Sequence, residues 1–379
     1  MRQKQASSVS LLNKHTNMKQ HLKIILSIII LIAIAVLIAR MPNKPPASIK
    51  IGVIVPLSGN VAFLGEGVRN AAMLAQSQLH DTRLKYELIF EDDGFDPKRT
   101  ASAAQKLISI DKVDAIVTLA SSAGNIVNPI AEKNKVIHFA IASDPTIAKG
   151  NYNFIHWTPP KAEVETFIKE LGRRKIRKIA IFGAHIPGII AINNEMKRQI
   201  AGTEISIVDE EDFNFGETDF KTRILKAQEK QPDIYVLFAF SPELENVTKQ
   251  LRELGVKTPI TAIESFEQTD QPQLYEGNWY VNAADATNAF IDLYQNKYGK
   301  QPTLGSANAY DIVGMIANAS EAAYAKTGKS SKDAIVSELL NIKGMSGALG
   351  DLTIDPEGFV ISKAVVRMIR NGKPVTIGQ

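Results

Sequence analysis

Residues 114–141, DAIVTLASSAGNIVNPIAEKNKVIHFAI, decide the fold class of this chain. An apolar run at 114–119 is followed by a small polar loop, a helical pattern near 124–133 and a second apolar run at 136–141. Near-continuous apolar strands that alternate with helices indicate a parallel sheet covered on both faces. This stretch therefore predicts an α/β fold.

The same alternation extends in both directions from this stretch. Further strands are predicted at 49–56, 85–91, 178–182, 204–208, 233–239, 259–263 and 277–282, and helices near 64–80, 97–110, 286–298, 304–325 and 330–342. The pattern restarts after Pro159-Pro160, which indicates two doubly wound parallel-sheet lobes. Ligands of open α/β sheets bind at the carboxyl ends of the strands, so we expect a cleft between the lobes.

A basic segment and an apolar run precede this body. Residues 24–39 read IILSIIILIAIAVLIA, and 1–23 contain five cations and no acid. A cationic stretch before an apolar run is typical of a cleaved signal peptide or a transmembrane anchor, and the length lies between the two classes. We predict a basic cytoplasmic tail at 1–23, a signal or anchor at 24–39 and a linker at 40–48.

Charge and cysteine content restrict the function of the body. Residues 1–46 contain seven cations and no acid, so the formal charge of +4 for the chain becomes −3 for the remainder. A mildly acidic body argues against nucleic acid as a partner. The absence of cysteine excludes disulfides, thiolate nucleophiles and a lipid-modified cysteine. These features favour the periplasm or the outer face of the cytoplasmic membrane.

Motifs for cofactors, metals and nucleophiles are weak. Residues 65–70, GEGVRN, lack the third glycine of a dinucleotide fingerprint and do not directly follow a strand. The histidines show no metal-ligand spacing, and the acids of 91–96 are better explained by a turn in which Asp96 caps a helix starting at Pro97. No G-x-S-x-G elbow is present. We expect no cofactor, no metal and no covalent chemistry, and an α/β enzyme remains a remote alternative.

Polar loops at strand ends are the candidate binding elements. Residues 120–124 (ASSAG) and 142–146 (ASDPT) each place small side chains and free backbone N–H groups beside a predicted helix start. Such a place suits a carboxylate or another anionic group. The alternative is simple helix capping, by Ser122 in one loop and by Ser143 or Asp144 in the other.

Glu264 directly follows the predicted strand 259–263. A lone carboxylate is costly to bury unless it is paired. A bound ammonium group is one possible partner, and a neighbouring Lys or Arg is the other.

The chain resembles the type I periplasmic binding proteins, in particular the leucine/isoleucine/valine receptors of ABC transporters. The resemblance covers nearly the whole body and depends on the order and spacing of several stretches. These are IKIGVIVPLSG with LGEGVRNAA, EDDGFDPKRTASAAQKLI, the two polar loops, NAYDIVGMIANA from residue 308, and GDLTIDPEGF at 350–359.

This resemblance implies two α/β lobes joined by three crossovers and a hinge, closing over a small ligand, an amino acid held by its backbone groups. We expect lobe 1 to comprise 49–158 and 284–345, and lobe 2 to comprise 159–283 and 346–379. In this family, a set of positions contacts the ligand's backbone groups, its amine and its side chain, and one places an aromatic ring over the ligand. The residues that correspond to these positions are Ser121, Ser122, Ala142, Ser143, Glu264, Phe240, Phe63 and Leu64.

One stretch departs from the family pattern. The family often has a tyrosine just before the glycine that opens the first helix of the second lobe, whereas this chain has AHIPG at 184–188. A ligand other than a branched-chain amino acid therefore stays open. The implied function is the substrate-binding component of an ABC importer, a monomer that delivers its ligand to a permease in the inner membrane. A ligand-sensing receptor with the same lobes is the alternative.

Overall fold

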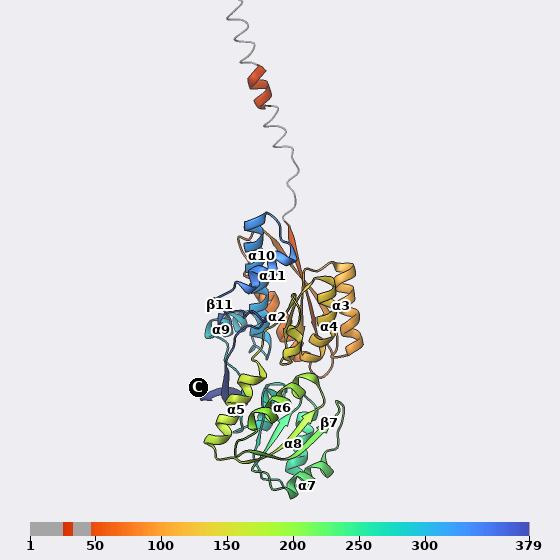
Figure 1. Cartoon of the computed structure of the whole chain (residues 1–379), viewed down its shortest axis with the longest axis vertical. Coiled ribbons are helices and arrows are strands. Elements are labelled where there is room, and N and C mark those ends of the chain that lie inside the picture. Colours follow the sequence, from red (N-terminus) through yellow and green to blue (C-terminus); the bar gives the residue numbers. More distant parts are fainter. Residues whose placement is uncertain (1–25, 33–46, 379) are drawn as a thin grey trace, which may run out of the picture. The chain divides into compact units, whose positions relative to one another are not determined.

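The computed structural model describes residues 26–32 and 47–378 of the chain (Figure 1). Residues 1–46 and 47–379 are separate units. In the first unit, residues 26–32 form a short helix with exposed side chains. Most of the predicted signal or anchor at 24–39 lies outside the described residues. Within the described ranges, no helix combines the length and the apolar character needed to cross a membrane.

The first half of the body is built on a five-stranded parallel sheet with the order β2-β1-β3-β4-β5. Every residue of the two middle strands β3 and β4 is buried, as the near-continuous apolar runs predict. The α/β prediction is therefore confirmed here. The strands are β1 (Ser48–Val55), β2 (Lys85–Asp92), β3 (Ala115–Leu119), β4 (Ile137–Ile141) and β5 (Asn153–Ile155).

Helices cover both faces of this sheet. In Figure 1, α2 and α10 lie on one face, and α3 and α4 lie on the other. The Asp96 carboxylate accepts hydrogen bonds from the N–H groups of Lys98 and Arg99, so the predicted cap before Pro97 is confirmed. The helices are α2 (Ala62–Ser77), α3 (Pro97–Lys106), α4 (Ser121–Asn134), α9 (Asn288–Tyr298), α10 (Ser306–Thr327) and α11 (Lys332–Leu340).

The second half repeats the architecture with a four-stranded parallel sheet in the order β7-β6-β8-β9. A bridge between Ile263 and Val281 connects this sheet to the antiparallel strands β10, β13 and β14. The strands are β6 (Lys178–Ala184), β7 (Ser206–Phe213), β8 (Ile234–Phe238), β9 (Ile260–Thr261), β10 (Trp279–Ala283), β13 (Ala364–Arg370) and β14 (Lys373–Gly378). The helices are α5 (Pro160–Arg173), α6 (Pro187–Ile200), α7 (Lys221–Glu229) and α8 (Glu243–Glu253).

The hydrophobic cores define the two lobes, and the chain passes between these cores three times. It leaves the first core after Trp157, returns to it before Phe290 and leaves it again after Val360. The predicted domain boundaries remain a prediction. The packing of one segment into a core differs from its predicted lobe. Residues 346–363 were assigned to lobe 2, whereas Leu352 and Val360 are buried in the first core. The hairpin of β11 (Met345–Gly347) and β12 (Gly350–Leu352) holds this segment there.

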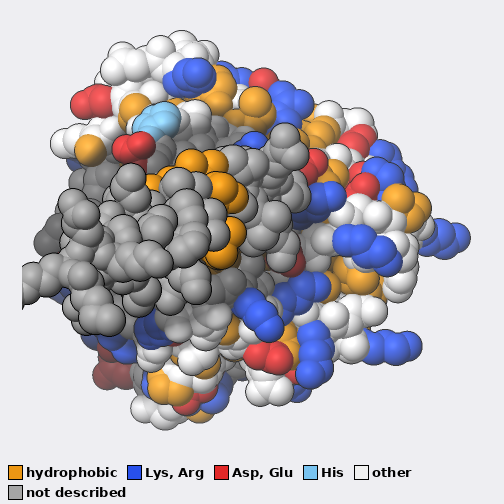
Figure 2. Space-filling model, turned by 90° about the horizontal axis from the view of Figure 1, so that it is seen from above, with side chains coloured by type: hydrophobic (Ala, Val, Ile, Leu, Met, Phe, Trp, Pro, Cys, Tyr) orange, Lys and Arg blue, Asp and Glu red, His pale blue; other side chains and the backbone are white. Residues whose placement is uncertain are grey.

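The surface of the body carries both signs of charge. On the face displayed in Figure 2, Lys and Arg side chains are interspersed with Asp and Glu side chains. Several of the charges on the body form ion pairs, such as Lys326 with Glu338 at 2.7 Å and Lys300 with Glu66 at 2.8 Å. Exposed pairs of this kind contribute little to stability, so the fold depends on its apolar cores.

Candidate ligand-binding site

A small cavity lies where the strand ends of the two parallel sheets face each other. Its volume is about 60 Å³, and one water needs roughly 10–15 Å³ of such space, so the cavity suits a small molecule. Most of its lining is apolar, and the polar side chains are four serines, one glutamate and one glutamine. The lining includes no Lys, Arg or His among the described residues.

The start of α4 forms one wall of this cavity. The helix begins at Ser121, and the residue before it, Ala120, provides no side-chain cap. Uncapped N–H groups at a helix start attract an anionic group. Ser122 lies inside the helix, so the interpretation of Ser122 as a cap is wrong. The helix starts three residues earlier than the sequence pattern predicts, and the polar loop forms its first turn.

Glu264 forms the opposite wall, and its carboxylate binds side chains of the first lobe. Its Oε1 accepts a hydrogen bond from Ser143 Oγ at 2.7 Å and another from the Trp157 indole N–H. Its Oε2 accepts a weaker bond from the Gln268 amide at 3.3 Å. Burial raises the pKa of Glu264 above its ordinary value, and the hydrogen bonds from Ser143 and Trp157 oppose that rise.

A second carboxyl group, that of Glu163 on α5, contacts Glu264. Glu163 is fully buried, and neither of its carboxyl oxygens receives a hydrogen bond from another donor. Burial and the neighbouring charge of Glu264 raise the pKa of Glu163 well above its ordinary value. We therefore assign the proton of the pair to Glu163, whose neutral carboxyl group neighbours Glu264.

The start of α6 approaches the start of α4 across the cavity. A Cβ atom on Gly188 would lie only 2.7 Å from Ser121 Oγ, so the two helix starts are in close contact. Ile186, just before Pro187, lines the cavity in the region where the family often has a tyrosine. This wall offers an apolar side chain in place of a phenolic hydroxyl.

Part of the backbone strain of the described residues lies at the cavity. Three of its lining residues other than glycine have positive φ angles, namely Phe95 (64°), Ala120 (74°) and Glu264 (63°). Such conformations are rare outside glycine and cluster at binding sites, because the surrounding structure must hold them. The strain is an independent indication that this cavity is the functional site.

The structure brings most of the predicted site residues together. Seven of them line the cavity: Ser121, Ser122, Ala142, Ser143, Phe240, Glu264 and Leu64. Phe63 is absent from the lining and packs against the first core instead. Adjacent residues of a helix point about 100° apart, and in α2 Leu64 lines the cavity whereas Phe63 does not. Asp144 caps the short 3₁₀ turn that follows it, as one alternative predicted.

Sequence reasoning missed three important residues. Phe95 and Trp157 line the cavity from loops in which no motif singled them out. Glu163 carried a readable signal, because it shares a helical face with the buried Val164, Phe167 and Leu171. A glutamate within such an apolar face indicates a buried acid that needs a partner.

Comparison with known proteins is consistent with this geometry. The periplasmic binding protein family matches residues 48–373. A Leu/Ile/Val-binding protein homologue from Brucella melitensis is 26% identical over 333 residues, covering 82% of this chain and 88% of that protein. The resemblance to the branched-chain amino acid receptors is therefore confirmed.

Two solved structures share the fold. A leucine-binding protein from Thermotoga maritima superposes with a TM-score of 0.79 at 23% identity, covering 87% of this chain and 98% of that one. A solute-binding protein of an ABC transporter from Rhodopseudomonas palustris, in complex with benzoate, gives 0.78 at 16% identity, covering 88% and 96%. At these identities the likeness establishes the architecture of two parallel-sheet lobes.

Proposed function

The chain belongs to the periplasmic binding protein family, and from this premise we propose that it is the extracytoplasmic substrate-binding component of an ABC importer. The two lobes close on a small ligand by hinge motion at the three crossovers, and the closed form is presented to a membrane permease. No covalent step is required of any residue in the cavity. The names of the relatives describe binding proteins, which supports this role.

We propose an amino acid with an apolar side chain as the ligand. The observation that carries this proposal is that an uncapped helix start and a buried carboxylate face each other across one small cavity. The ligand's carboxylate fits the N–H groups of Ser121 and Ser122, and its ammonium group fits Glu264. The apolar remainder fits the wall formed by Ile186 and Phe240.

An aromatic acid without an amine is the second candidate. The Rhodopseudomonas palustris neighbour holds benzoate, and Phe95 and Phe240 offer aromatic faces in this cavity. Against this candidate, the described lining residues include no cation, while Glu264 lines one end and the buried Glu163 lies next to it. A ligand that brings its own ammonium group satisfies this acidic end better than a simple anion does.

A thermal-shift screen of the purified chain against amino acids, amides and aromatic acids tests the proposal. A ligand at 100 times its Kd adds roughly 2.7 kcal/mol to the free energy of unfolding. We expect stabilisation by apolar amino acids, and we expect Glu264→Gln to abolish it because the ammonium loses its counter-charge. Glu229→Gln, on an exposed residue of α7, is the matched control and should leave the shift unchanged.

The outcomes separate the candidates. Stabilisation only by benzoate-like acids, unaffected by Glu264→Gln, would favour the aromatic-acid candidate. Amino-acid binding without ligand-dependent uptake in membrane vesicles that contain the cognate permease would favour the sensing receptor over the importer. A folded chain that no compound stabilises would contradict both ligand assignments.

A further inference from the structure

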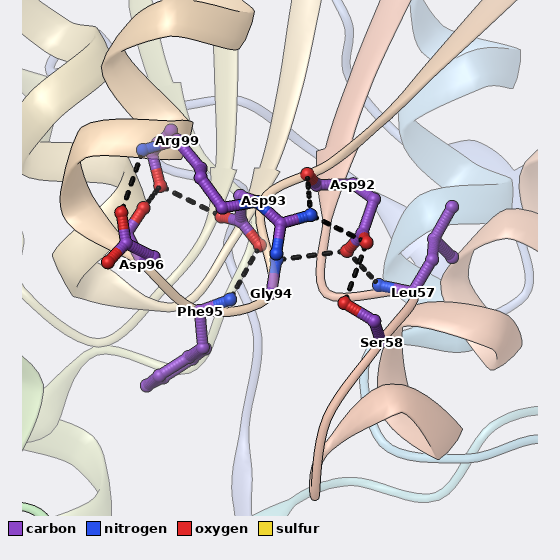
Figure 3. Close-up of polar contacts among 9 residues, drawn as sticks. Leu57, Ser58, Asp92, Asp93, Gly94, Phe95, Asp96 and Arg99 are labelled. Atoms are coloured by element: carbon purple, nitrogen blue, oxygen red, sulfur yellow. Dashed lines mark hydrogen bonds and ion pairs between the residues drawn. The ribbon is translucent and has the colours of Figure 1, made fainter.

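Four hydrogen bonds converge on the carboxylate of Asp92, the last residue of β2 before the loop to α3 (Figure 3). Its Oδ1 accepts from the N–H groups of Leu57 at 2.8 Å and Gly94 at 2.9 Å. Its Oδ2 accepts from Ser58 Oγ and Arg99 Nη2, both at 2.7 Å. Burial raises the pKa of Asp92, but these hydrogen bonds together lower it to about 2. The loop is therefore anchored by an ionised carboxylate at any physiological pH.

The same loop holds Phe95 in an uncommon conformation. Asp93, which is 1% exposed, accepts hydrogen bonds from the Phe95 N–H at 3.0 Å and from Thr100 Oγ1 at 2.9 Å. The φ angle of Phe95 is 64°, a region that bulky side chains rarely occupy. Figure 3 shows the Phe95 side chain pointing away from these carboxylates. The polar network thus directs one ring out of the first lobe.

That ring meets two rings of the second lobe. The centroid of Phe95 lies 5.6 Å from that of Phe240 and 6.1 Å from that of Phe215. Both separations fall within the range of favourable aromatic pairs. Phe95 and Phe240 also line the cavity, whereas Phe215, in the loop after β7, is 49% exposed. The three rings, here named the aromatic cluster, therefore join the lobes between the ligand cavity and solvent.

We propose that Phe95 covers the ligand in the closed cleft and, through the aromatic cluster, determines how long the cleft stays closed. The ligand-covering part of this role rests on the proposed function. Each aromatic pair is worth a factor of roughly 2–13 in population. Loss of the Phe95 ring removes two such pairs, so we expect a change of about tenfold in the ratio of closed to open molecules.

Distances between the two lobes, measured by electron–electron double resonance, test this proposal without a ligand. Because the chain contains no cysteine, Ser102→Cys on α3 and Lys249→Cys on α8 place spin labels on two exposed sites, one in each lobe. We expect a short-distance population in the otherwise unchanged chain. Phe95→Ala should reduce its ratio to the long-distance population about tenfold, and Phe95→Leu, which keeps an apolar side chain, should reduce it less.

Phe90→Ala is the matched control, because Phe90 on β2 is a half-buried phenylalanine of the same lobe that does not line the cavity. It should leave the distance ratio unchanged. The proposal is overturned if Phe95→Ala keeps the original ratio, or if Phe90→Ala changes the ratio as much as Phe95→Ala does. Asp92→Asn should reproduce the effect of Phe95→Ala and add nothing to it, since both changes act on the same ring.

A second measurement separates this proposal from the proposed function. With L-leucine or L-phenylalanine as the probe, Phe95→Ala should raise the ligand dissociation rate about tenfold. If neither amino acid binds but the distance ratio still responds to Phe95→Ala, the aromatic cluster stands and the amino-acid assignment fails. If the amino acids bind and neither the distance ratio nor the dissociation rate responds, the aromatic cluster fails and the assignment stands.

Discussion

Single residues of this cavity illustrate how burial determines the charge of a binding site. Glu163 and Glu264 lie together without a cation among the residues that affect their pKa values. Two adjacent buried carboxyl groups cannot both ionise at neutral pH, so the pair holds one proton. The ammonium group of a ligand would supply part of the positive charge that this proton provides to the two carboxyl groups.

This proton makes stability depend on pH in a specific direction. The native state keeps a proton on Glu163 that the unfolded chain releases above its ordinary pKa of about 4.3. The free energy of unfolding should therefore fall as the pH rises from that value towards the raised pKa of the native group, by up to about 1.4 kcal/mol per pH unit. Chemical denaturation at a series of pH values between about 4.5 and about 8 measures this slope.

Glu163→Gln removes the titrating group but keeps a hydrogen-bond donor towards Glu264. The free energy of unfolding of this variant should depend less on pH than that of the unchanged chain. At about pH 8 it should be higher than that of the unchanged chain. Glu229→Gln, which changes an exposed glutamate, should follow the profile of the unchanged chain. A Glu163→Gln profile as steep as that of the unchanged chain would show that Glu163 is already ionised in the native state.

At the scale of elements, the contact between the starts of α4 and α6 determines whether the lobes can close. Gly188 meets Ser121 at a distance that leaves no room for a Cβ atom. Ser121 Oγ cannot easily move aside, because it accepts a hydrogen bond from the Asp144 N–H at 3.1 Å. The absence of a side chain at residue 188 is therefore a requirement of the closed form.

Alanine substitution at two helical glycines should weaken ligand binding in one case and stabilise the fold in the other. Gly188→Ala should weaken ligand binding by roughly 1–3 kcal/mol, the usual effect of overpacking a close contact. Gly172→Ala in α5 adds a Cβ atom with nothing within 4 Å, so it should raise the free energy of unfolding by up to about 1 kcal/mol. Titration calorimetry and chemical denaturation of both variants measure these effects, and equal ligand affinity in both would refute the steric argument.

At the scale of the whole molecule, the buried cores found among the described residues lie in the body, residues 47–378. The three hydrophobic clusters draw on both parallel sheets and on the helices around them. Residues 1–46 form a separate unit in which residues 26–32 have exposed side chains. The stability of the body should therefore not depend on the segment that precedes it.

Removal of residues 1–46 should shift the melting temperature by less than about 2 °C, since 1 kcal/mol corresponds to about 2–4 °C in domains of 150–250 residues. Calorimetry of the full chain and of the shortened chain measures this difference. Light scattering on the shortened chain should give the mass of a monomer. A large fall in melting temperature would mean that the N-terminal segment packs on the body.

The α/β architecture follows from local patterns of the sequence. The alternation of apolar strands with helical patterns places β1 to β4 within one residue of their predicted ranges, because burial on both faces of a parallel sheet leaves a local signal. The polar loops and Glu264 were also readable, since strand ends of such sheets meet at one edge. The helix starts were less readable. The start of α4 carries no side-chain cap that would mark it in the sequence, and α4 begins before its predicted position.

The contacts between residues that are distant in the chain follow instead from the packing of the two lobes. Ser143 and Glu264 are separated by 121 positions, and the ring of Phe95 meets that of Phe240 across the cleft. The chain reverses between the lobes at three crossovers, and no local pattern encodes where these bring two side chains together. The periodicity of apolar residues indicates which side chains of one element are buried. Which side chain a buried carboxyl group or ring contacts depends on the packing of elements that lie far apart in the sequence.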